Sequence, residues 1–293
     1  MTTTAPIGAH LIGGDWSTDA PGGTAVSDNP ARPDEPVGEY PLGDAGTAAQ
    51  AVGAAVEAQA AWRAAGFGSR SRILERAAVL FDERADELAL VCTLEEGKTL
   101  AESRGEAVLS AETCRYQAGL AKTSTERIFP TGNPGETIRT VRAPLGVVGI
   151  ITPWNFPILL PVWKIAPALV AGNPVAWKPA SNTPLTAVAI AAVFADAGLP
   201  AGVLNLVLGP GSVGGALVAD ERVVGRDRVT GQRAAEIVDV DAQHLAAQRR
   251  RILRTRVRIV GATAIAHADV EDGAAIVRRP AGSQFPQQVV LGD

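Results

Sequence analysis

Three short segments of the sequence combine residue types that can position a reacting or bound molecule, and each follows an apolar run. In residues 152–155 (TPWN), the amide of Asn155 can donate hydrogen bonds to an oxyanion. In residues 178–182 (KPASN), the Lys178 ammonium can donate to ribose or phosphate oxygens. Residues 209–215 (GPGSVGG) contain the G-x-G-x-x-G pattern, whose backbone amides can hold a pyrophosphate at the start of a helix.

Each of these segments also has a purely structural interpretation. A loop amide commonly satisfies local backbone groups, a single lysine is usually solvated, and many glycine-rich turns only turn the chain. The acidic residue that binds an adenine ribose, expected about 20 residues after such a glycine motif, is not evident here. The glycine motif alone therefore leaves nucleotide binding open. A binding site is indicated only if the three segments lie together in the fold.

The elements predicted around the three segments bring them to one edge of a sheet. Apolar runs predict buried strands, and the stretches between them predict helices, one of which has Pro184 in its first turn and Gly198 past its end. Alternating strands and helices predict a parallel sheet with right-handed crossovers, and ligands bind at the carboxyl ends of such strands. The predicted strands are 146–152, 173–179 and 202–209, and the predicted helices are 160–172, 183–198 and one that begins at 211.

The first part of the chain is predicted to support this sheet. Residues 10–45 are rich in glycine and proline and predict short strands and turns, with a hairpin at Gly13-Gly14. Apolar spacing then predicts helices over 47–65, 69–97 and 99–121, with Gly97 as a C-cap. Cys92 and Cys114 fall within these helices, and we expect both to be small buried hydrophobic residues.

Length and composition narrow the class of protein. The chain has 293 residues, enough for a sizeable core and two domains, and a net charge of −4, which gives no reason to expect nucleic acid or an anionic membrane as partner. The N-terminus lacks the regions of a signal peptide, and no apolar run reaches the roughly 18 residues of a membrane span. With two cysteines, we expect a cytoplasmic protein without a disulfide framework. We also expect no metal site.

The segments PWNFP, AGNPVAWKPAS and GLPAGVLNLVLGPGSVG resemble, in order and spacing, the cofactor domain of the NAD(P)-dependent aldehyde dehydrogenase superfamily, continuously from about Pro144 to Val224. The resemblance implies an α/β fold with a Rossmann-like parallel sheet flanked by helices and a truncated catalytic domain. It divides the chain into an N-terminal hairpin segment (1–45), a helical part of the cofactor-binding domain (46–143), an NAD(P)-binding core (144–224) and a divergent tail (225–293).

The resemblance also assigns roles to individual residues. Asn155 would be catalytic, as the amide that helps to stabilise the oxyanion of a thiohemiacetal. Ser181 occupies the place where NAD-preferring members often have Glu, whose carboxylate repels a 2′-phosphate, so NADP or NAD is expected as cofactor. Residues 198–215 are similar to members that act on semialdehydes of sugar-acid catabolism. The predicted cofactor-binding residues are Thr152, Pro153, Trp154, Lys178, Ala180, Ser181, Gly211 and Gly215.

Two residues that the chemistry of this family requires are not found. A cysteine thiolate attacks the aldehyde carbon, and a glutamate in a Glu-Leu-Gly-Gly segment activates the water that hydrolyses the thioester. No cysteine follows Cys114, and residues 249–258 (RRRILRTRVR) occupy the place of Glu-Leu-Gly-Gly. Residues 283–290 loosely match the stretch before the nucleophile, with Val290 near the cysteine position. We therefore expect an aldehyde or semialdehyde oxidoreductase by ancestry that is inactive in this form.

Three explanations of the tail stay open. A frame-disrupted gene is favoured, because permitted codons for Arg254-Thr255-Arg256 encode Glu-Leu-Gly in the next reading frame. The second is a pseudoenzyme that keeps a cofactor-binding module as a regulatory or assembly subunit. The third, a nucleic-acid arm over 222–258, is disfavoured because its arginines lack interleaved aromatic residues. We expect the tail to pack poorly. If the chain is active, we expect a small aldehyde as its substrate. A homo-oligomer is not expected, because the family's C-terminal assembly segment is missing.

Overall fold

The computed structural model describes residues 8–123, 127–131, 137–140, 142–223, 267–271, 274–278 and 289–291. Contacts within the chain divide it into two units. The first is Met1–Thr123 with Pro144–Asp241, and the second is Ser124–Ala143 with Ala242–Asp293. The four segments expected from the sequence (1–45, 46–143, 144–224 and 225–293) have boundaries that differ from those of these two units, and this division stays a prediction.

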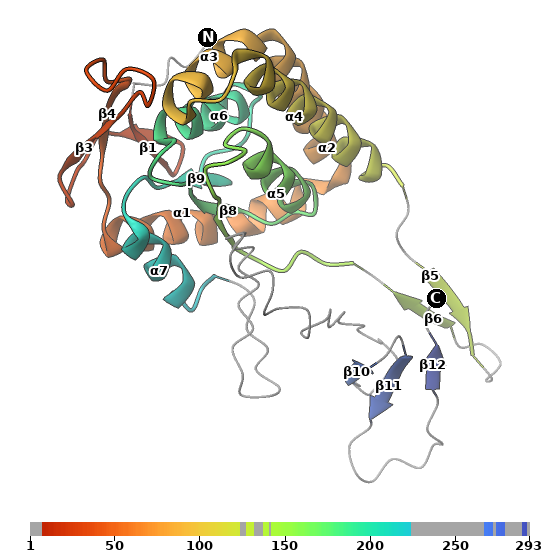
Figure 1. Ribbon diagram of the computed structural model, residues 1–293. Coiled ribbons are helices and arrows are strands. Elements are labelled where there is room, and N and C mark those ends of the chain that lie inside the picture. The colour runs from red at the N-terminus through yellow and green to blue at the C-terminus, as the bar shows by residue number, and fades with distance from the viewer. Residues whose placement is uncertain are drawn as a thin grey trace. The chain divides into compact units, whose positions relative to one another are not determined.

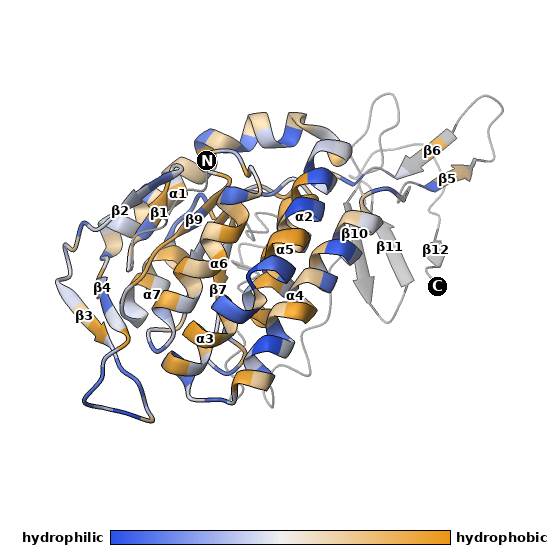
Figure 2. Ribbon diagram, turned by 90° about the horizontal axis from the view of Figure 1, so that it is seen from above, coloured by the Kyte–Doolittle hydropathy of each residue, from blue (hydrophilic) through white to orange (hydrophobic). Residues whose placement is uncertain are grey.

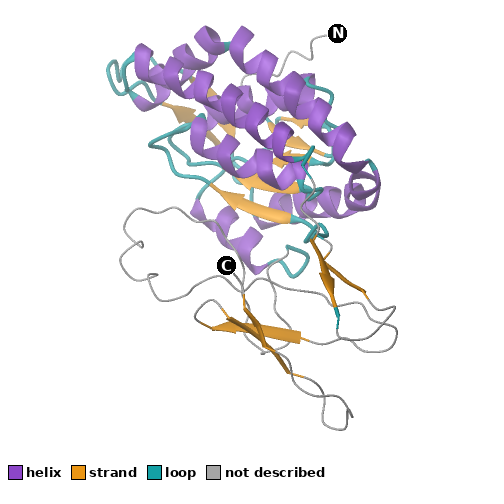
Figure 3. Cartoon of the chain, turned by 90° about the vertical axis from the view of Figure 1, so that its right-hand side faces the viewer, coloured by secondary structure: helices purple, strands orange, loops and turns teal. Residues whose placement is uncertain are grey.

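A five-stranded sheet lies among the helices of the first unit (Figure 3). The order of its strands is β2-β1-β9-β8-β7. Its last three strands are parallel, as the sequence predicted. Ile151 pairs with Lys178, so the neighbouring strands reach the same edge of the sheet at their carboxyl ends. The parallel strands are β7 (Val148–Ile151), β8 (Val175–Lys178) and β9 (Leu204–Leu206).

Two N-terminal strands extend the sheet beyond β9. β1 (His10–Ile12) and β2 (Asp15–Ser17) form the hairpin predicted at Gly13-Gly14, and β1 pairs antiparallel with β9. Asn205 of β9 is fully buried and accepts a hydrogen bond of 2.9 Å from the Gly13 amide. The sequence predicted the hairpin, whereas its attachment to the strand of a distant segment is a finding of the structure.

Helices cover both faces of the sheet (Figure 1). α1 and α7 pack on one face, α5 and α6 pack on the other, and α2, α3 and α4 lie outside α5 and α6. The helix predicted over 69–97 is divided at Arg84, whose φ of −103° and ψ of 14° interrupt it, whereas Gly97 ends α3 at a φ of +88°, as predicted. The helices are α1 (Ala45–Ala64), α2 (Gly66–Glu83), α3 (Ala85–Glu96), α4 (Leu100–Leu120), α5 (Leu159–Val170), α6 (Pro184–Asp196) and α7 (Gly211–Ala219).

The apolar pattern of the sequence explains these layers. Val175 and Trp177 of β8 join the core beneath α5 and α6, whereas Ala176 between them joins a smaller core beneath α1 and α7. Figure 2 shows that α5 and α6 are largely hydrophobic, as expected of helices covered by the sheet on one side and by other helices on the other. Cys92 and Cys114 are buried and unpaired, which confirms their predicted place in the core.

None of the described helices has the length and apolar character needed to cross a membrane. Predictions about residues 224–266, including 249–258, fall outside the described residues, whereas Val290 belongs to the short strand β12.

The remaining described elements are short strands. In the first unit, β3 (Thr24–Ser27) pairs with β4 (Gly38–Pro41); in the second, β5 (Arg127–Pro130) pairs with β6 (Thr137–Thr140), and β10 (His267–Glu271), β11 (Ala274–Arg278) and β12 (Val289–Leu291) form an antiparallel sheet.

A buried histidine joins β1 to the segment after β9. The Nδ1 atom of His10 accepts a hydrogen bond of 3.0 Å from the Leu208 amide, so the ring must be neutral, with its proton on Nε2. Within the described residues, Nε2 has no hydrogen-bond partner. Burial lowers the pKa of His10 from 6.5, and this effect exceeds the opposing influence of the nearby Asp19.

This histidine makes stability depend on pH in a predictable direction. With a depressed pKa, the folded chain resists a proton that the unfolded chain accepts, so the stabilising contribution is present above pH 6.5 and decreases as the pH falls below it. His10→Asn keeps an acceptor near the Nδ1 position but does not titrate. We expect urea denaturation to show that the free energy of unfolding falls less between pH 8 and pH 5 in the variant than in the wild-type chain. The same pH dependence of stability in both chains would contradict the assignment.

Candidate functional site

The structure brings together the ends of the three parallel strands. The Thr152 amide, just after β7, donates to the Lys178 carbonyl at 3.2 Å. The Ser181 hydroxyl, in the loop after β8, donates to the Gly209 carbonyl at 2.9 Å. A Cβ atom at Gly214 would lie 3.9 Å from Cδ of Lys178, so the first turn of α7 packs on the lysine stem. The predicted convergence of the three segments is therefore present.

Lys178 is a buried cation that is incompletely paired by the protein. The residue is only 6% exposed, and burial lowers the pKa of its ammonium. Of its three N–H donors, one is directed to the Ser181 hydroxyl at 3.4 Å, and this hydroxyl is its one hydrogen-bond partner among the described residues. An oxygen-rich ligand at this edge of the sheet could supply hydrogen-bond acceptors for the other N–H groups of the Lys178 ammonium.

The loop after β8 is held in place by a tyrosine. The hydroxyl of Tyr40, at the end of β4, donates to the Ser181 carbonyl at 3.0 Å, while the Ser181 side chain donates to Gly209. Because the Ser181 proton is committed to Gly209, its oxygen presents lone pairs toward Lys178. Ala180 and Ser181 are both partly exposed, as residues that contact a ligand must be.

The glycine turn has one constrained glycine and two open ones. Gly209 has a φ of +148°, and a Cβ there would lie 3.1 Å from the Gly43 carbonyl oxygen, so the backbone requires glycine. Gly211 and Gly215 are exposed, and a Cβ at either would meet nothing within 4 Å. The N-cap residue of α7, Pro210, makes no side-chain hydrogen bond to the helix, and the Val213 amide donates to the Pro210 carbonyl at 3.1 Å. The preceding amides of Gly211 and Ser212 are positioned to donate to an anion.

The loop that carries Asn155 begins at a buried threonine and then becomes exposed. Oγ1 of Thr152 accepts from the indole N–H of Trp177 at 3.0 Å, which fixes the start of the loop to β8. Pro153 is half-buried, Trp154 is 52% exposed, and Asn155 is exposed. The Asn155 carbonyl accepts from Lys98 Nζ at 2.7 Å, so the described contacts tie this residue to the α3–α4 turn and not to Lys178.

Two buried glutamates near the site were missed by the sequence analysis. Oε2 of Glu106 accepts from the amides of Ile158 and Leu159 at 3.0 and 3.1 Å, at the start of α5. Glu95 accepts from the amides of Leu185 and Thr186 at 2.8 and 2.6 Å, at the start of α6. Neither helix is capped by a side chain of its own N-cap residue. The only sequence signal was a glutamate at a buried position of a predicted helix.

The two cysteines of the chain are poor nucleophiles where they stand. Both are fully buried, Cys92 in α3 and Cys114 in α4. Burial raises the pKa of each thiol to about 12, so almost none is ionised near neutral pH. Neither cysteine can take the role of a reactive thiolate without rearrangement of the core.

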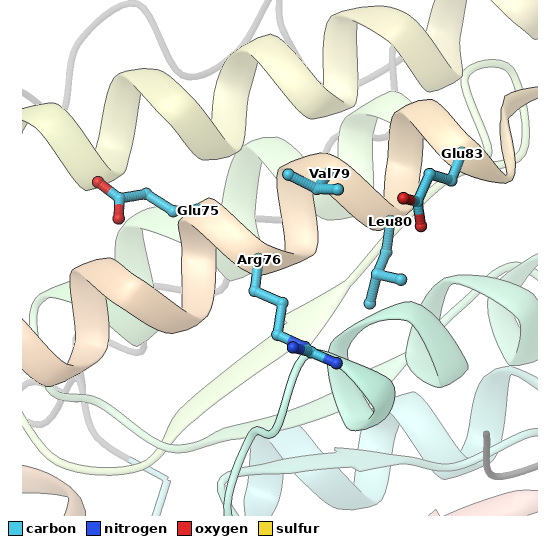
Figure 4. A pocket seen from close by; sticks show the side chains of 5 residues that line it. All are labelled: Glu75, Arg76, Val79, Leu80 and Glu83. Carbon is cyan, nitrogen blue, oxygen red and sulfur yellow. The ribbon is translucent and has the colours of Figure 1, made fainter. Parts of the chain in front are cut away.

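A surface depression on α2 lies among residues that are not part of this site. Its lining residues are Glu75, Arg76, Val79, Leu80 and Glu83, and Figure 4 shows the Arg76 side chain extending away from its helix. Arg76 donates to the Asp196 carbonyl at 3.3 Å, which joins α2 to the end of α6. The depression contains none of the predicted site residues.

Comparison with known proteins agrees with the arrangement of strand ends. The model of the family described as "Aldehyde dehydrogenase family" matches residues 16–272. The chain belongs to the aldehyde dehydrogenase family. The match begins well before the segment 144–224, on which the resemblance was first recognised.

Individual relatives are similar over about three quarters of the chain. An alpha-ketoglutaric semialdehyde dehydrogenase of Bacillus subtilis (strain 168) is 42% identical over 222 residues, which cover 76% of this chain and 46% of the relative. A solved structure of an NADP-dependent enzyme of E. coli matches with a TM-score of 0.71 and 38% identity, over 73% of this chain and 45% of that one. A NAD-dependent aldehyde dehydrogenase from Sinorhizobium meliloti matches with a TM-score of 0.72 and 34% identity, over 75% and 44%. The chain thus spans less than half the length of each of these relatives.

Proposed function

We propose that this aldehyde dehydrogenase chain binds NAD or NADP at the carboxyl ends of β7, β8 and β9. The observation that carries the proposal is the Lys178 ammonium, which has one hydrogen-bond partner among the described residues and lies beside the start of α7, where the N-cap residue Pro210 makes no side-chain cap. The N-terminus of a helix and a buried cation both favour the anionic and hydroxyl groups of a dinucleotide. Thr152, Pro153, Trp154, Lys178, Ala180, Ser181, Gly211 and Gly215 are the proposed contact residues.

The residues present fit such a cofactor, which accepts a hydride when it is bound. Among the described residues, Lys178 has N–H donors without a protein partner, which can donate to ribose hydroxyls, and the Ser181 oxygen offers lone pairs to a hydroxyl donor. The absence of side chains at Gly211 and Gly215 leaves room for close approach of the pyrophosphate or adenine. Asn155 is the proposed amide for an oxyanion, because it is exposed in the loop after β7.

The same geometry favours tolerance of both cofactors. Ser181 carries no charge, so it does not repel a 2′-phosphate, and the neighbouring Lys178 ammonium attracts one. The solved relatives include both a structure titled as an NADP-dependent enzyme and one titled as NAD-dependent. We propose that NADP binds no more than a few-fold more weakly than NAD.

Replacement of Ser181 tests the assignment. Ser181→Glu is expected to weaken NADP by about tenfold or more, equivalent to roughly 1.4 kcal/mol, through repulsion of the 2′-phosphate, and to leave NAD within a few-fold. Titration calorimetry with both cofactors measures the effect. Ser181→Ala is the matched control, because it removes the hydroxyl without adding charge and should not discriminate between the cofactors. An equal loss of both cofactors in Ser181→Glu would show that this residue does not face the 2′ position.

We further propose that the chain descends from enzymes that oxidise an aldehyde or a semialdehyde to a carboxylate, and that it does not turn over in this form. The relative from Bacillus subtilis is named for a semialdehyde, which favours this class of substrate. The buried cysteines favour inactivity, since the family's reaction begins with a thiolate. A cofactor-binding regulatory subunit is the alternative, and it has no support from the comparisons.

A further inference from the structure

The loop of Asn155 to Leu159 is held at both ends by one pair of charged side chains. At its start, the Asn155 carbonyl accepts from Lys98 Nζ at 2.7 Å. At its end, the amides of Ile158 and Leu159 donate to Oε2 of Glu106. The other carboxylate oxygen of Glu106 accepts from Lys98, so the two anchors form one continuous network.

This pair is buried more than a surface ion pair would be. The side chains of Lys98 and Glu106 are 12% and 4% exposed, and Glu96 lies 3.9 Å from the same ammonium. Lys98 Nζ also lies 4.7 Å from the centroid of the Phe156 ring, within reach of a cation–π interaction. Lys98 thus contacts two consecutive residues of the loop, Asn155 through its backbone and Phe156 through its ring.

Lys98 lies in a closely packed turn between α3 and α4. The preceding Gly97 has a φ of +88°, and a Cβ there would lie 2.8 Å from Cγ of Pro30, so the turn is packed closely. The following Thr99 caps α4 in a reciprocal capping box with Glu102. The lysine therefore extends from a well-packed turn between α3 and α4, and its hydrogen bond to the Asn155 carbonyl holds the loop against this turn.

We propose that Lys98, oriented by Glu106, is a positioning residue for the loop that carries Asn155. It contacts neither the proposed cofactor site nor the Asn155 amide; it fixes the backbone from which that amide projects. The proposal rests on the proposed function only for its catalytic meaning, because the ordering of the loop is a property of the chain itself. Without the ammonium, the loop would lose its hold at Asn155 while α5 would keep its cap.

Fluorine NMR of the full chain labelled with 5-fluorotryptophan tests the proposal. The chain has five tryptophans, and the Trp154 signal, assigned with Trp154→Phe, reports on the residue next to Asn155. In Lys98→Met, the Trp154 signal should shift or broaden, while the signals of the buried Trp62 and Trp177 should stay in place. Lys98→Arg should restore most of the wild-type signal, because a guanidinium can reach the same carbonyl.

The control is Lys122→Met, which removes an exposed lysine that pairs with Glu75 and should move none of these signals. An unchanged Trp154 signal in Lys98→Met would overturn the proposal. Equal changes at Trp62, Trp154 and Trp177 would also overturn it, because they would make Lys98 a general stabilising residue.

Cofactor affinity separates this proposal from the proposed function. If the chain binds NAD, Lys98→Met should weaken it by roughly threefold to tenfold, because the loop must then be ordered on binding, and Lys122→Met should not. If wild-type chain binds no dinucleotide, the proposed function fails, yet the Trp154 signal still decides the role of Lys98. Equal NAD affinity in wild type and Lys98→Met, with dinucleotide binding intact, would count against positioning of the cofactor side of the loop.

Discussion

Purified chain is expected to form no NADH or NADPH above background when it is given short aliphatic aldehydes or semialdehydes. Oxidation in this family requires a thiolate near the oxyanion amide. The two thiols of the chain, Cys92 and Cys114, are fully buried with pKa values raised to about 12. Misplacement of a reacting group by about one ångström costs on the order of a hundredfold in rate, so a buried thiol in α3 or α4 should not substitute. Absorbance at 340 nm over hours, with each cofactor, measures the rate.

Two variants make this result informative. Val290→Cys places a thiol near the position where the family's nucleophile is expected, and it should not restore activity by itself, because the general-base glutamate is also not found. Steady NADPH formation by the unmodified chain, abolished by Cys92→Ser or Cys114→Ser, would show that one of these thiols had been recruited. The Ser variants also report on packing, since each places a hydroxyl in the core.

Glu95→Ala is expected to reduce the free energy of unfolding by about 3 kcal/mol or more, because each buried donor left unsatisfied costs about 1–3 kcal/mol. The Glu95 carboxylate accepts hydrogen bonds from the Ser27 hydroxyl at 2.6 Å, the Thr186 hydroxyl at 2.7 Å and two amides of α6. Its loss would leave these donors unsatisfied in a site that is 4% exposed. Thermal unfolding should shift down by roughly 10 °C, at about 2–4 °C per kcal/mol.

Matched variants separate the cap from the charge. Burial raises the pKa of Glu95, so the ionised form is itself costly and is offset by its hydrogen bonds. Glu95→Gln keeps the shape and one acceptor oxygen, and it should lose less stability than Glu95→Ala. Glu102→Ala removes an exposed carboxylate from the capping box of α4 and should cost less stability than Glu95→Ala. Equal losses for Glu95→Ala and Glu102→Ala would show that burial adds nothing at Glu95.

Much of the fold followed from local patterns. Apolar runs predicted β7, β8 and β9, and special residues such as Gly97 and Pro184 marked the helix ends where the structure has them. The break at Arg84 was missed because no glycine or proline marks it, and apolar spacing continues on both sides. On either side of the break, α2 and α3 both pack against α4 and α6, contacts that the local sequence does not report.

The candidate site could be predicted only in part. The convergence of residues 152–155, 178–182 and 209–215 followed from the rule for parallel strands. The roles of Glu95, Glu106 and Tyr40 depend on contacts across long stretches of chain, as in the hydrogen bond from Tyr40 to the Ser181 carbonyl over 141 positions. No periodicity within one segment reports such a partner, and a glutamate in a helix normally indicates solvent exposure.

The pairing of β1 with β9 sets the order in which the protein can be completed during synthesis. His10 contacts Leu208 across 198 positions, and Gly13 contacts Asn205 across 192. At about 5–20 residues per second, the ribosome takes roughly 10–40 s to make that interval. Throughout this time β1 can pair only with β2, and α1 lacks the strand β9 on which it packs. The nascent chain therefore exposes one unpaired edge of β1 and an apolar face of α1 until β9 emerges, and we expect chaperones to bind it at this stage.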